Sequence, residues 1–199
     1  MSLLEVIDVE IIRSTLASPK ISRGIVKYLY IMDELHKRDV SNSVDFQKIY
    51  NGFYRMGRRT PEFYQVYYEY MEKHKSSQIA FEDVLNHLYN NTSRIEASFA
   101  SKLLATINPD MPVWDENVLS QLSLQRPHLG QSNKEKQLNE SVRTFFILLE
   151  WYLGFLKTIN AKEVIRIFDD FYPNTSITDV KKIDIALWSM GKKVNQNCL

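Results

Sequence analysis

Apolar side chains recur along this chain at the three- and four-residue spacing of amphipathic α-helices. In the segment 21–38, for example, Ile21, Ile25, Tyr28 and Leu35 fall on one face of such a helix. No stretch alternates apolar and polar residues over the length that a β-strand requires. Only six glycines and six prolines interrupt the pattern in 199 residues. The sequence therefore predicts an all-α protein.

Residues that favour helix starts divide the pattern into short helices. Thr60 precedes Pro61, and a proline at the first helical position loses no hydrogen bond, because its missing N–H has no partner there. Ser93 and Glu96 have the spacing of a capping box, and Thr178 is expected to begin the last helix. We expect nine or ten helices in a compact multi-helix array rather than a four-helix bundle.

The segment 125–139 is polar and contains Pro127 and Gly130, which is typical of an exposed connection. A long helix is predicted to follow over 141–158, and Asn160 is expected to cap the next one. We interpret residues 1–199 as a single helical domain, with the segment 125–139 as its only candidate internal boundary.

Charge and cysteine content exclude several kinds of site. The chain has 25 lysines and arginines against 24 aspartates and glutamates, so nucleic-acid binding would require a local basic patch. The single cysteine, Cys198, cannot form an internal disulfide, and the four histidines have no metal-ligand spacing. We therefore expect no metal site and no cofactor.

Hydropathy favours a protein without a membrane partner. The longest apolar stretch, near 145–156, is interrupted by Glu150 and Gly154 and is too short to span a bilayer. The first five residues lack the basic and then apolar layout of a signal peptide. We expect a cytoplasmic location, and the oligomeric state stays open.

The segment 93–122 has the most specific arrangement of residues. A short turn precedes a helix that carries Ala97-Ser98-Phe99-Ala100-Ser101-Lys102, and a loop then ends in Pro112-Val113-Trp114-Asp115. This order resembles the helix-hairpin-helix DNA glycosylase superfamily, in which a hairpin and a helix precede a loop with a Val-Asp-Thr-His-Val-like sequence. The resemblance implies a glycosylase-like helical fold, and it implies DNA as the partner.

The resemblance also implies a role for Asp115, which matches the catalytic aspartate of that family, while Val118 matches the apolar residue three positions later. The family's hairpin glycines are absent from 92–97, and its Schiff-base lysine aligns near Ala97. A monofunctional enzyme needs only a carboxylate that stabilises an oxocarbenium-like sugar and directs water onto it, with the target base flipped out. The alternative is that Asp115 serves only as a helix N-cap.

A second candidate site is the arginine-rich stretch Arg55-Met56-Gly57-Arg58-Arg59, which lies between Tyr54 and Phe63-Tyr64. Arg55, Arg58 and Arg59 could hold phosphates while the neighbouring rings stack on bases. Lys102 is a further candidate contact for the same ligand. The alternative is a solvated helix end whose aromatic rings point into the core.

Three functions are compatible with these residues. The first is a DNA-associated protein that resembles base-excision glycosylases, with or without catalysis by Asp115. The second is a non-enzymatic helical binding module that has lost the DNA hairpin. The third is a small-molecule enzyme with a pocket rimmed by Asp115, Lys102 and the tryptophans.

Overall fold

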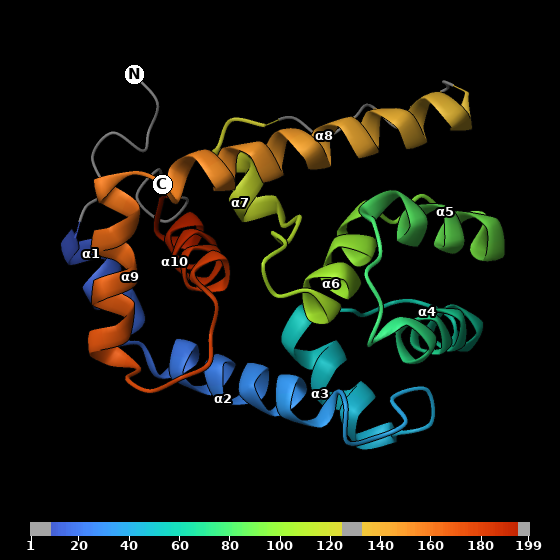
Figure 1. Cartoon of the computed structure of the whole chain (residues 1–199), viewed down its shortest axis with the longest axis horizontal. Coiled ribbons are helices and arrows are strands. Elements are labelled where there is room, and N and C mark those ends of the chain that lie inside the picture. The colour runs from blue at the N-terminus through green and yellow to red at the C-terminus, as the bar shows by residue number, and fades with distance from the viewer. Residues whose placement is uncertain (1–8, 125–132, 195–199) are drawn as a thin grey trace. The chain divides into compact units, whose positions relative to one another are not determined.

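The computed structural model describes residues 9–124 and 133–194, and these residues form helices and no β-strand. The all-α prediction is confirmed, and the described residues form ten helices (Figure 1). In chain order these are α1 (Val9–Leu16), α2 (Pro19–Glu34), α3 (Val44–Tyr54), α4 (Pro61–His74), α5 (Phe81–Thr92), α6 (Ala97–Ile107), α7 (Glu116–Gln121), α8 (Lys134–Phe155), α9 (Ile159–Phe171) and α10 (Asp179–Val194). None of these helices is long and apolar enough to cross a membrane.

The chain divides into two compact units, which are described separately. Residues 1–22 and 109–199 form the terminal unit, and residues 23–108 form the central unit, so α2 belongs to both. The division falls outside the polar segment 125–139, of which residues 125–132 lie outside the described part of the chain. That one domain comprises residues 1–199 stays a prediction.

In the terminal unit, α10 packs against α1, α7 and α9 (Figure 1). The face that α10 presents to its neighbours includes Ile183 and Leu187, which are 1% and 2% exposed. The hydroxyl of Tyr172 donates to the carbonyl oxygen of Leu16 at 2.6 Å and ties the end of α9 to the end of α1. Packing on α10 therefore holds the loop before α7 and the start of α7 within one unit.

In the central unit, α4, α5 and α6 pack against one another, and the core beside them is rich in aromatic rings. Tyr50 of α3 and Tyr67 of α4 are fully buried, and their hydroxyls lie 2.8 Å apart. The Tyr67 hydroxyl also donates to the carbonyl oxygen of Phe99 at 3.1 Å. Burial raises the pKa of both tyrosines well above the ordinary value, so both hydroxyls remain protonated hydrogen-bond donors.

Three predicted helix starts are confirmed. Thr60 caps α4 by accepting a hydrogen bond from the N–H of Phe63. Asp115 caps α7. Thr178 accepts from the N–H of Lys181 at 3.3 Å and precedes α10, as its position in the sequence predicts.

The predicted capping box at Ser93 and Glu96 is wrong. Ser93 ends α5 with a left-handed backbone (φ 56°), and α6 begins at Ala97 after Glu96. The Glu96 carboxylate pairs with Arg59 and Arg94 instead of turning back to a backbone N–H. The Glu96 side chain therefore forms an ion pair with Arg59, which is distant in the sequence, and does not cap α6.

Two boundaries near α8 and α9 also differ from the prediction. The Asn133 side chain accepts from the N–H of Glu135 and caps α8, so residues 134–139 are helical and not a connection. Thr158, and not Asn160, caps α9 by accepting from the N–H of Ala161 at 3.2 Å. The cap residue lies eight positions before the expected start for α8 and two positions before the expected cap for α9, and periodicity alone does not locate it.

Candidate functional site

In the central unit, Glu96 brings together two arginines that are far apart in the sequence. The Arg59 Nη2 donates to Glu96 Oε2 at 3.0 Å, and Arg59 Nε lies 3.0 Å from Oε1. The Nε contact is not aligned as a hydrogen bond, so the ion pair rests on Nη2 and on charge attraction. The Arg94 Nε lies 3.2 Å from the same Oε1. Two guanidinium groups therefore share one carboxylate.

Phe99 of α6 joins Lys102 to this group. The guanidinium carbon of Arg59 lies 4.7 Å from the centroid of the Phe99 ring, and the Lys102 ammonium lies 5.1 Å from it. Both distances are those of cation–π contacts. Lys102 is only 7% exposed, so its charge acts on the surroundings of Phe99 rather than through a surface contact.

The loop between α3 and α4 carries the other two predicted arginines. Arg55 and Arg58 are exposed, and both have left-handed backbones, with φ values of 54° and 63°. Two side chains hold the loop: Arg59 Nη1 donates to the Arg58 carbonyl oxygen at 3.1 Å, and the Tyr64 hydroxyl donates to that of Met56 at 2.5 Å. These two hydrogen bonds fix the backbone of the loop that carries the exposed Arg55 and Arg58 side chains.

We call the side chains of Arg55, Arg58, Arg59, Arg94 and Lys102 the basic cluster. The structure brings Arg59 and Lys102 to one ring and places Arg94 beside Arg59. Arg94 is absent from the sequence-based candidates because its segment has the pattern of a capping box. The only feature of the sequence that could have indicated Arg94 is its position two residues before Glu96, a carboxylate with which a distant arginine can also pair.

The rings of Tyr54 and Phe63 beside the arginine loop are not available for stacking. Tyr54 and Phe63 are 6% and 3% exposed, and Tyr67 is fully buried. Their rings fill the core of the central unit, as the alternative interpretation of this stretch expected. The part of the hypothesis that remains is the contact between arginines and phosphates.

Asp115 lies in the terminal unit, at the start of α7. Its Oδ1 accepts a hydrogen bond from the N–H of Asn117 at 2.9 Å, and the residue is half-buried. Val113 and Trp114 immediately before it are 4% and 3% exposed and anchor the loop in the core. The N-cap role is confirmed, and a catalytic role stays a prediction.

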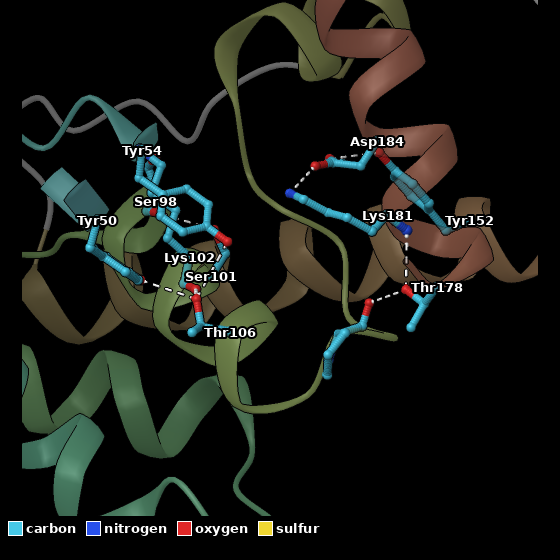
Figure 2. Close-up of polar contacts among 11 residues, drawn as sticks. Tyr50, Tyr54, Ser98, Ser101, Lys102, Thr106, Tyr152, Thr178, Lys181 and Asp184 are labelled. Atoms are coloured by element: carbon cyan, nitrogen blue, oxygen red, sulfur yellow. Dashed lines mark hydrogen bonds and ion pairs between the residues drawn. The ribbon is translucent and has the colours of Figure 1, made fainter. Parts of the chain in front are cut away.

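A buried polar network in the same unit connects α8 to α10 (Figure 2). The Tyr152 hydroxyl donates to Asp184 Oδ1 at 3.1 Å, and Lys181 Nζ donates to Asp184 Oδ2 at 2.7 Å. Burial is the main cause that raises the pKa of Tyr152 well above its ordinary value, and the negative charges of Asp184 and Asp115 raise it further. Asp115 is therefore within electrostatic range of the Tyr152–Asp184–Lys181 network.

Two of the histidines also contact one aromatic ring. The rings of His74 and His87 lie 4.3 and 4.1 Å from that of Tyr70, measured between centroids. Within the described residues, no group of three or more histidine, cysteine, aspartate or glutamate side chains could hold a metal ion. His128 and Cys198 lie outside the described part of the chain.

No protein-family model, curated protein or solved structure matches the chain. The resemblance to the helix-hairpin-helix glycosylases therefore remains a hypothesis that rests on the residues of 93–122. The basic cluster and the surroundings of Asp115 are the features of the structure that bear on function.

Proposed function

We propose that this protein binds DNA through phosphate contacts made by the basic cluster of the central unit. The observation that carries the proposal is the convergence of Arg59 and Arg94 on Glu96, which places the arginine loop beside an arginine from the turn between α5 and α6. The resemblance of the segment 93–122 to DNA glycosylases is what favours DNA over other polyanions.

The chemistry of the cluster suits a phosphate backbone. Arg58 and Arg94 are exposed, and a guanidinium group can donate two parallel hydrogen bonds to one phosphate. Arg59 and Lys102 add positive charge behind these contacts, while Glu96 holds Arg59 and Arg94 in place. Because the whole chain carries a net charge of only +1, we expect binding that is weak, local and strongly dependent on salt.

A salt-dependent binding experiment tests this function. We expect fluorescence anisotropy to detect binding of the full chain to a short labelled duplex at low salt, with affinity that falls as salt rises. The double variant Arg58→Ala/Arg94→Ala should lower the slope of log affinity against log salt by about 2, because two phosphate contacts are lost. A wild-type protein that binds no duplex at low salt would contradict the proposal.

The matched control is the double variant Lys27→Ala/Lys48→Ala. It removes the same charge from exposed positions on α2 and α3 of the central unit. If binding depends on the basic cluster, this control should lower the salt slope much less than Arg58→Ala/Arg94→Ala does. Equal losses in the two double variants would indicate attraction to net charge alone.

Base excision by Asp115 is a second candidate function. Its support is that Asp115 is a half-buried carboxylate near the Tyr152–Asp184–Lys181 network, in the segment that resembles the glycosylase loop. We propose testing it with damaged and mismatched duplexes. Base release leaves an abasic site, which is detected by cleaving the strand there with alkali after the reaction. The Asp115→Asn variant keeps a residue that caps helices well but removes the charge, so it should fold and not excise. If the wild type releases no base from any duplex, excision is excluded and the DNA-binding proposal stands unchanged.

A further inference from the structure

Arg58 occupies a backbone conformation that suits glycine better than arginine. Its φ of 63° lies in the left-handed region, where the Cβ of an L-residue crowds the backbone. The neighbouring residue is Gly57, yet no glycine in the described residues has a positive φ. The loop therefore places the strained conformation on the arginine and not on the adjacent glycine.

The contacts of Arg58 hold its backbone and not its side chain. Its carbonyl oxygen accepts from Arg59 Nη1 at 3.1 Å, and Arg59 is in turn paired with Glu96. Within the part of the chain that the structure describes, the exposed Arg58 guanidinium has no hydrogen-bond or ion-pair partner. The arginine side chain consequently adds no contact that would offset the strain of its backbone.

We propose that Arg58 is a DNA phosphate contact that the loop presents at a cost in stability. This inference rests on the proposed DNA-binding function and adds a consequence that the function alone does not have. Replacing Arg58 with glycine should raise the stability of the protein and weaken DNA binding at the same time. If Arg58 only capped or solvated the loop, its replacement with glycine would not combine higher stability with weaker DNA binding.

Ser93 offers a matched control for the backbone. It has a φ of 56°, is exposed, and lies in the central unit at the end of α5. Ser93→Gly relieves the same kind of strain without removing a charge. Arg58→Ala completes the set, because it removes the charge while keeping a Cβ in the left-handed conformation.

The experiment measures the melting temperature and duplex binding of the wild type and the three variants. Arg58→Gly and Ser93→Gly should each raise the melting temperature by about 1–4 °C, since relief of the left-handed strain exceeds the entropy that glycine adds to the unfolded chain. Arg58→Ala should give no such rise. Arg58→Gly and Arg58→Ala should both lower the salt slope by about 1, and Ser93→Gly should leave it unchanged.

The outcomes separate this inference from the function on which it rests. If the wild type binds duplex and Arg58→Gly binds equally well, the role of Arg58 is refuted while DNA binding stands. If Arg58→Gly lowers the melting temperature and Ser93→Gly raises it, the arginine stabilises the loop and the inference is also wrong. If the wild type binds no duplex at low salt, the proposed function itself fails, and the role of Arg58 fails with it.

Discussion

Removal of the Lys181 ammonium should be among the most damaging single changes in the terminal unit. Lys181 and Asp184 are 4% and 5% exposed, and their charged atoms lie 2.7 Å apart. Tyr152 is fully buried and donates to the other carboxylate oxygen. In Lys181→Met, the methionine fills similar space, but Asp184 keeps only the tyrosine hydroxyl as its partner in this network.

The magnitude follows from the burial of the pair. Breaking a buried ion pair by removing one partner typically costs about 3–5 kcal/mol, because a charge is left without compensation in a low dielectric. For a chain of this size each kcal/mol lowers the melting temperature by about 2–4 °C. Lys181→Met should therefore melt about 6–20 °C below the wild type. The corresponding loss of about 3–5 kcal/mol is a large part of the free energy of unfolding of an ordinary domain.

Chemical denaturation monitored by circular dichroism measures this effect, and a double variant provides its control. Lys181→Met/Asp184→Asn removes both charges and keeps a side-chain oxygen that can accept from the Tyr152 hydroxyl, so no buried charge is left without a partner. We expect the double variant to recover most of the stability that Lys181→Met loses. A loss below about 1 kcal/mol in the single variant would refute the reasoning, since that is the size of a surface pair. A double variant less stable than the single one would refute it as well.

Three further changes test other parts of the structure. Tyr67→Phe should cost about 1–3 kcal/mol in urea denaturation, because the buried Tyr50 hydroxyl and the Phe99 carbonyl oxygen each lose a hydrogen bond. Burial, the largest cause, lowers the pKa of His87 from its ordinary value of 6.5, so the folded protein binds this proton less readily than the unfolded chain. Stability should therefore decline as the pH falls below about 6.5, and His87→Gln should flatten that decline in a pH series of melts. Thr60→Ala should lower the free energy of unfolding by about 0.5–1 kcal/mol through loss of the α4 cap, whereas Thr60→Ser should leave it nearly unchanged.

Local sequence patterns predicted the helices whose determinants lie within one turn. Thr60 before Pro61 and Asp115 before Glu116 each place an oxygen next to a free backbone N–H, and no distant residue is needed to form that cap. The periodicity of the segment 21–38 is likewise local, and its predicted inner face is buried at Ile21 and Leu35. The helices α1 and α3 were not identified from the sequence.

The wrong capping box arose because a side chain had more than one available partner. Glu96 has the spacing to cap the helix that follows Ser93, but Arg59, 37 positions earlier, binds it instead. Sequence spacing does not contain the distance between these two residues. The same limitation kept Arg94 out of the predicted DNA contacts, since it joins the basic cluster only through Glu96.

By itself, the sequence determined the helical class of the protein and several helix starts, because both depend on residues within a few positions of one another. Only the tertiary structure decided which side chains form a site. Tyr152 and Asp184 are 32 positions apart, and their hydrogen bond exists because α8 and α10 bury both groups together. Burial removes water as an alternative partner, so the fold determines which polar groups must bind one another.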